Sequence, residues 1–128
     1  MAAYLVIDLI KAAILLSELI DSRDEALTDE HQLVSRGLDE LNTLLRLSYE
    51  NKIVPGNINY ETDPVPQYDS YYEEIKGLPE YYLEFLRYGL AERLCDIDAI
   101  KLPDKKKGDL ADKRSNVQAH YLSNFTIG

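Results

Sequence analysis

The residues best suited to chemistry in this chain of 128 residues are few and far apart in the sequence. His31 and His120 are the only histidines, and neither has a partner at the H-x-x-x-H spacing of a zinc site. Cys95 is the single cysteine, which excludes an intramolecular disulfide and a cysteine-based metal cage. We therefore predict capping or surface roles for the histidines, a buried core thiol for Cys95 and no metal-binding residue.

Carboxylates are plentiful, but their spacing does not indicate catalysis. A glycosidase holds two carboxylates several ångströms apart around a sugar, with the pKa of one of them raised. The acidic pairs of this chain, such as Glu73-Glu74 and Asp39-Glu40, are neighbours of the kind found on solvated surfaces. The sequence contains no G-x-x-x-x-G-K, G-x-G-x-x-G or G-x-S-x-G motif. We predict no enzyme activity, no catalytic or cofactor-binding residue and no cofactor.

Tyrosine is the most informative residue type. Seven of the ten tyrosines fall within residues 60–88, a stretch that is also rich in acids and prolines. Tyrosine offers a large, rigid and amphipathic contact area with few torsions to restrict, which suits protein–protein contacts. We expect Tyr82 to lie in the core, and we predict that an interface contains Tyr60, Tyr68, Tyr71 and Tyr72.

Positive charge gathers near the C-terminus. Residues 1–100 hold 20 acidic and 8 basic side chains, a net −12, whereas residues 101–128 hold 3 acidic and 6 basic ones, a net +3. Lys105, Lys106 and Lys107 form either a solvated helix start or a surface that docks on an acidic partner, such as an adjacent copy of this chain. To this predicted C-terminal docking segment, residues 104–128, we add the aromatic residues Tyr121 and Phe125.

Net charge and hydropathy restrict the classes of partner. The formal net charge of −9 repels nucleic-acid phosphates, so sequence-specific nucleic-acid binding is not expected. Residues 1–20 are largely apolar, but Asp8 and Lys11 interrupt the run, and no basic residue precedes it. A signal peptide or a membrane-spanning helix would not tolerate this pattern well, so we expect a buried helix and no membrane contact.

Hydrophobic periodicity predicts a single all-α domain over residues 1–128, a bundle of three to four helices. Thr28 is a good N-cap candidate, and Pro79 suits the first turn of a later helix. After each of these two helix-start residues, apolar residues recur every three to four positions. The expected helices cover residues 3–20, 29–50, 79–95 and about 104–123.

The segment between the second and third expected helices has no sustained period. Pro55-Gly56 favours a type II turn, and the apolar residues on either side of it could pair as a short β-hairpin. Residues 61–77 contain Pro64, Pro66 and Gly77. Because so long a stretch without a helix is unusual inside a compact domain, we expect residues 51–77 to form an extended interface arm or a hairpin.

Taken in order, these segments resemble the head-to-tail adaptor proteins of short-tailed bacteriophages, also called head-completion or tail accessory factors. The resemblance covers roughly residues 4–95, and its weight lies in the order and spacing of the motifs. The matching motifs are Asp8-Leu9-Ile10-Lys11-Ala12-Ala13, Leu27-Thr28-Asp29-Glu30, Leu38-Asp39-Glu40-Leu41-Asn42, Tyr49, Ile53-Val54-Pro55-Gly56, Gly77-Leu78-Pro79-Glu80-Tyr81 and Leu90-Ala91-Glu92-Arg93-Leu94. The chain departs from the family pattern because it has no tryptophan. In the family an aromatic residue often ends the second helix, and Ser48-Tyr49 stands at that place here.

The resemblance implies a structural virion protein at the junction of portal and tail, present in the host cytoplasm during assembly. Its partners would be about twelve copies of itself in a ring, the portal protein, and tail or nozzle proteins. Packaged DNA would pass through the channel without sequence-specific binding. Three alternatives remain: a connector of another tailed-phage type, a peptidoglycan-degrading virion enzyme, and a cytoplasmic regulatory helical module.

Overall fold

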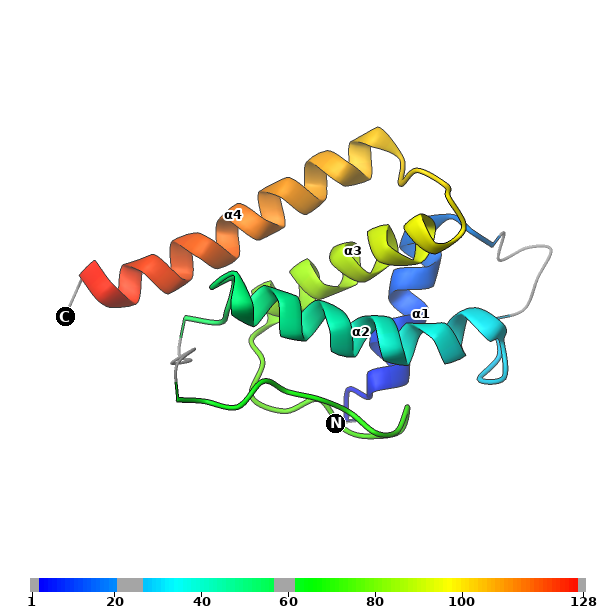
Figure 1. Cartoon of the computed structure of the whole chain (residues 1–128), viewed down its shortest axis with the longest axis horizontal. Coiled ribbons are helices and arrows are strands. Elements are labelled where there is room, and N and C mark those ends of the chain that lie inside the picture. The colour runs from blue at the N-terminus through cyan, green and yellow to red at the C-terminus, as the bar shows by residue number, and fades with distance from the viewer. Residues whose placement is uncertain (1–2, 21–26, 57–61, 127–128) are drawn as a thin grey trace.

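The chain folds into four helices that share one core (Figure 1). The computed structural model describes residues 3–20, 27–56 and 62–126, with side chains described as far as Leu122. The helices are α1 (Val6–Ser17), α2 (Gln32–Glu50), α3 (Glu80–Ile97) and α4 (Asp104–Thr126). The described residues contain no strand, only an isolated antiparallel bridge between Leu5 and Glu74. The prediction of an all-α bundle is therefore confirmed.

Most helix boundaries differ from the prediction by one to three residues, and two of the differences have a clear local cause. The first helix ends at Ser17, because Glu18 adopts a left-handed conformation with φ of 59°. The second begins at Gln32, and its N-cap is His31, whose ring Nδ1 accepts a hydrogen bond from the backbone N–H of Leu33 at 3.1 Å. The capping role predicted for His31 is confirmed, whereas Thr28 is not the N-cap.

Helix α3 is the centre of the bundle, and each of the other three helices packs against it. Helix α1 crosses behind α2 and α3 in Figure 1 and presents a nearly continuous buried face to both. Helices α1 and α2 approach closely at Gly37, where an added Cβ would overlap the side chain of Ile10. The fully buried large side chains come from α1, α2, α3 and the loop before α4: Tyr82, Leu9, Ile10, Ile14, Leu41, Leu45, Leu86, Leu90, Leu94, Leu102, Val6 and Val34.

Helix α4 lies over α3 and is held by a narrow stripe of Leu110, Val117 and Tyr121. An ion pair and a stacked pair of rings also connect it to α3. Lys113 forms an ion pair with Glu84 at 2.9 Å. Further along, the ring of His120 stacks on Tyr81 with a centroid distance of 3.8 Å and an interplanar angle of 13°. The helix is therefore anchored at several points along its length.

The expected free arm is not observed. Residues 62–78, which we call the tyrosine segment, fold back against the bundle below α1 and α2 in Figure 1. The N–H groups of Val6 and Ile7 donate to the backbone carbonyls of Glu73 and Tyr71 at 2.9 and 2.8 Å. The first turn of a helix has N–H groups without partners inside the helix, and the tyrosine segment supplies acceptors for two of them. The described residues therefore do not support an extended arm. The proposed hairpin is not supported either, and one of its two strands falls within residues 57–61, which lie outside the described residues.

The last four carbonyls of α1 also find partners, from three parts of the chain. The hydroxyl of Ser17 and the backbone N–H of Glu18 serve two of them. The thiol of Cys95 donates to the carbonyl of Ser17 at 3.6 Å, and the ammonium of Lys106 donates to the carbonyl of Leu16 at 2.8 Å. Buried helix ends require such partners, so α3 and α4 are both tied to the end of α1.

Candidate interaction site

The tyrosine segment is positioned by one side chain of α2. The amide of Asn42 accepts a hydrogen bond from the N–H of Tyr68 and donates one to its carbonyl, both at 2.9 Å. The ring of Tyr68 then packs half-buried against the core, and this burial, followed by the nearby charge of Glu73, raises the pKa of its hydroxyl. Asn42 therefore acts like a neighbouring strand, because it satisfies both backbone groups of Tyr68.

A tight acidic turn follows, which we define as residues 69–74. One carboxylate oxygen of Glu73 accepts from the backbone N–H groups of Asp69 and Ser70, at 2.5 and 2.8 Å. The isolated bridge between Glu74 and Leu5 fixes the other end of the turn against the start of α1. The turn is thus held by its own carboxylate and by backbone contacts, and its remaining side chains face outward or along the surface.

Tyr72 is the most exposed aromatic residue of this turn, at 59%. Its hydroxyl donates to Asp29 at 3.0 Å, while Lys11 pairs with the other oxygen of Asp29 at 2.5 Å. The hydrogen bond from Lys11, and then that from Tyr72, lowers the pKa of Asp29; the same bond to Asp29 raises the pKa of Tyr72. The hydroxyl is therefore held in place while the ring remains available to a partner.

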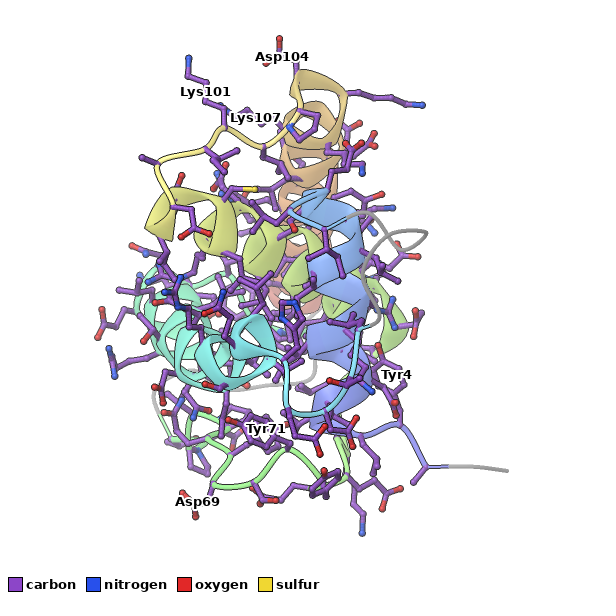
Figure 2. All side chains as sticks on the ribbon, turned by 90° about the vertical axis from the view of Figure 1, so that its right-hand side faces the viewer. Tyr4, Asp69, Tyr71, Lys101, Asp104 and Lys107 are labelled. Atoms are coloured by element: carbon purple, nitrogen blue, oxygen red, sulfur yellow. The ribbon has the colours of Figure 1, made fainter. Side chains whose placement is uncertain are left out.

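The structure gathers three of the four predicted interface tyrosines. Tyr68, Tyr71 and Tyr72 lie together along the tyrosine segment, and Tyr71 reaches the carbonyl of Ser35 with its hydroxyl at 3.5 Å. Tyr60 lies outside the described residues. Figure 2 shows Tyr71 near one end of the molecule, close to the labelled Asp69.

The predicted C-terminal residues are not gathered in the same way. Lys105 is exposed and Lys107 half-buried, but the ammonium of Lys106 serves the end of α1 and pairs with Glu18 at 3.2 Å. Tyr121 is only 7% exposed and belongs to the core. The side chain of Phe125 lies outside the described ones. Of this predicted set, Lys105 and Lys107 are thus the residues that the structure leaves accessible.

Sequence reasoning missed an exposed apolar pair at the end of α3. Ile97 and Ile100 are 43% and 49% exposed, and they adjoin the exposed Lys101 in the loop that leads to α4. The predicted third helix stopped at residue 95, which left these residues without an assigned environment. Their position after the end of the apolar stripe of that helix could have identified them, because apolar residues outside the stripe are not expected to lie in the core.

A shallow groove of about 460 Å³ runs between α1, α3 and α4. Exposed Leu15 and the ring of Tyr88 give it an apolar lining. Its charged groups are already paired inside the chain, since Arg87 binds Glu80 at 2.7 Å and Lys113 binds Glu84. The groove is therefore an apolar surface feature with a neutralised rim.

None of the helices in the described ranges is long and apolar enough to cross a membrane. The same ranges contain no group of three or more His, Cys, Asp or Glu side chains arranged to hold a metal ion. Comparisons with protein-family models, curated proteins and solved structures gave no match to this chain.

Proposed function

We propose that this chain is a structural virion protein that acts as a head-to-tail adaptor of a short-tailed bacteriophage. Several copies would form a ring, of about twelve members by the family resemblance, beneath the portal protein. The ring would extend the DNA channel, help to retain packaged DNA and offer a platform to tail or nozzle proteins. The protein would act in the virion at the portal vertex, after a period in the host cytoplasm, and without enzyme activity.

The observation that carries the proposal is the set of exposed large apolar side chains that the four-helix core leaves uncovered. The core itself is complete, with more than twenty buried hydrophobic residues. Exposed large apolar residues nevertheless remain on all four helices and on two of the connecting segments: Leu15, Leu47, Tyr72, Ile97, Ile100 and Leu122. Exposed apolar side chains of this kind suit a subunit that is covered on several faces by other subunits and by a larger scaffold.

The charge of the chain also supports the proposal. A ring built from subunits with a net charge of −9 would surround its channel with largely acidic walls. Acidic walls repel phosphates, so DNA could slide through the channel without adhering to it. The order of sequence motifs over residues 4–95 supplies the specific link to the adaptor family.

The test is electron microscopy of the purified chain mixed with the portal protein encoded by the same genome. We expect a ring of this chain on one face of the portal. Replacing the tyrosines in Tyr71→Ala/Tyr72→Ala should leave the isolated subunit folded, since the backbone carbonyls that cap α1 remain, but should reduce ring formation. Absence of any portal complex, or normal assembly of a chain that proves to cleave purified cell wall, would contradict the proposal.

A further inference from the structure

The molecule carries an acidic turn at one end, and at the other end several lysines that form no ion pair with a described residue. Figure 2 shows Asp69 and Tyr71 at one end, and Lys101, Asp104 and Lys107 at the other. Figure 1, turned by 90° about the same vertical axis, places the green tyrosine segment and the yellow loop between α3 and α4 at the same two ends. The separation is therefore real in three dimensions, and the two ends of one chain cannot touch each other.

The first end is the acidic turn. Residues 69–74 contain three acids, no base and the exposed ring of Tyr72. Asp69 has no ion pair within the described part of the chain, whereas Glu74 pairs with Lys76 at 3.4 Å on the surface. A rigid aromatic ring surrounded by carboxylates is suited to a partner that offers both cations and apolar area.

The second end offers that combination. We call it the lysine end and define it by Ile97, Ile100, Lys101, Lys105 and Lys107. The two isoleucines are exposed apolar area, and the three lysines form no ion pair with any residue that the structure describes. Lys106 is excluded from the definition because its ammonium is used at the end of α1.

Acidic residues near the lysine end reduce its net charge but leave its three lysines without an ion pair to a described residue. Asp98 is occupied by Arg36 at 3.1 Å, while Asp96 and Asp104 are exposed. The lysine end nevertheless presents three cations beside two exposed isoleucines, and it forms part of the surface of a chain whose formal net charge is −9. An acidic partner can pair with these cations.

We infer that the lysine end of one copy binds the acidic turn of a second copy. The two complementary surfaces lie at opposite ends of the same chain, so a contact between them is heterologous. Repetition of a heterologous contact gives a closed ring if the rotation closes, and a filament if it does not. The inference rests on the proposed function in that both require self-association, but it specifies which surfaces meet.

An exchange of charges between the two ends tests this contact. The first variant, Lys101→Glu/Lys105→Glu, has acidic residues at both ends; the second, Asp69→Lys/Glu74→Lys, has basic residues at both ends. Each variant alone should self-associate at least about tenfold more weakly than the unmodified chain at low salt. An equimolar mixture should regain association, because each variant then meets the opposite charge on the other. Sedimentation velocity measures all three samples.

The controls address folding and non-specific charge. Arg46→Glu/Arg114→Glu makes the same change of charge at exposed positions that belong to neither of the two defined surfaces, and it should associate like the unmodified chain. Circular dichroism verifies that every variant is folded, and Tyr72→Phe should keep the contact while Tyr72→Ala weakens it. Unchanged association of the separate variants, a mixture of folded variants that stays monomeric, or an unmodified chain that is monomeric at every concentration would each overturn the inference.

Failure of this inference can be distinguished from failure of the proposed function. If the chain assembles on the portal while the charge exchange has no effect on self-association, the inference is wrong and the adaptor proposal stands. If self-association follows the charge exchange but no portal complex forms, the contact is real and the adaptor proposal is wrong.

Discussion

Two tyrosine hydroxyls in the core show how strongly the surroundings of a residue decide its chemistry. The hydroxyl of Tyr82 shares a hydrogen bond of 2.7 Å with Ser48, which itself donates to the carbonyl of Leu45. The hydroxyl of Tyr49, only one position after Ser48, is buried and has no hydrogen-bond partner in the part of the chain that the structure describes. Burial raises the pKa of both tyrosines, and that of Tyr49 rises to about 12, with smaller contributions from Asp63 and Tyr68.

These pKa shifts predict a loss of stability at alkaline pH. Between the ordinary tyrosine pKa near 10 and the value of about 12, Tyr49 loses its proton in the unfolded chain but keeps it in the folded one. The folded state then binds more protons, so the contribution of Tyr49 to the free energy of unfolding should be constant below pH 10 and decrease as pH rises toward 12. Urea unfolding at a series of pH values measures this slope.

Tyr49→Phe is the matched control for that slope. Removing an unsatisfied hydroxyl should raise the free energy of unfolding by about 1 kcal/mol at neutral pH and make its alkaline decrease shallower. Tyr82→Phe removes a satisfied hydroxyl, so it should instead lower the free energy of unfolding by about 1 kcal/mol. Equal effects of the two substitutions would contradict the different surroundings seen in the core.

At the level of elements, close contacts between helices depend on single small residues. Gly37 lies in the second turn of α2 and faces Ile10 of α1, a fully buried and β-branched side chain with little freedom to move. Gly108, near the start of α4, has no atom within 4 Å of the position that a Cβ would take. The same substitution should therefore have opposite effects at the two glycines.

Gly37→Ala should lower the free energy of unfolding by about 1–3 kcal/mol, because the new methyl group overpacks the contact between α1 and α2. Gly108→Ala should raise it by about 0.5–1 kcal/mol, because alanine is the better helix former and nothing obstructs it. Chemical denaturation of both variants gives the comparison. A stabilised Gly37→Ala variant would show that α1 can move away from α2 at little cost.

The tyrosine segment shows that an element without periodicity can still be a structural part of the bundle. Its backbone carbonyls cap the start of α1, and its own backbone is held by the amide of Asn42. These interactions leave the ring of Tyr72 exposed on an ordered support. An ordered support reduces the entropy lost on binding, which favours the segment as an interface.

At the scale of the whole molecule, charge should affect folding and assembly in opposite directions. The chain has a formal net charge of −9, and its like charges repel one another in the folded state. Salt screens this repulsion, and it also screens the attraction between the lysine end and the acidic turn.

Raising the ionic strength to about 0.5 M should therefore raise the Tm of the isolated subunit while weakening its self-association. Thermal unfolding followed by circular dichroism gives the first quantity, and sedimentation velocity gives the second. Self-association that strengthens with salt would indicate an interface dominated by apolar contacts, such as the groove beside Leu15, in place of the charged ends.

The sequence by itself determined the four helices and most of the core. Apolar residues at intervals of three to four positions depend only on neighbours along the chain, so periodicity placed the end of α2 at Glu50 and the start of α4 at Asp104 close to where they lie. It also indicated that Tyr82 and Cys95 are buried.

Only the tertiary structure decided what the irregular segment and the lysines do. The carbonyls that cap α1 lie more than sixty positions along the chain from it, and Lys106 reaches a carbonyl that precedes it by ninety positions. No local sequence pattern predicts such pairs. Backbone carbonyls are the same for every residue type, and a lysine is expected to be solvated unless its partner is known. The segment that composition suggested as an arm thus caps the start of α1. Lys106, which was expected to dock on a partner, binds the end of α1.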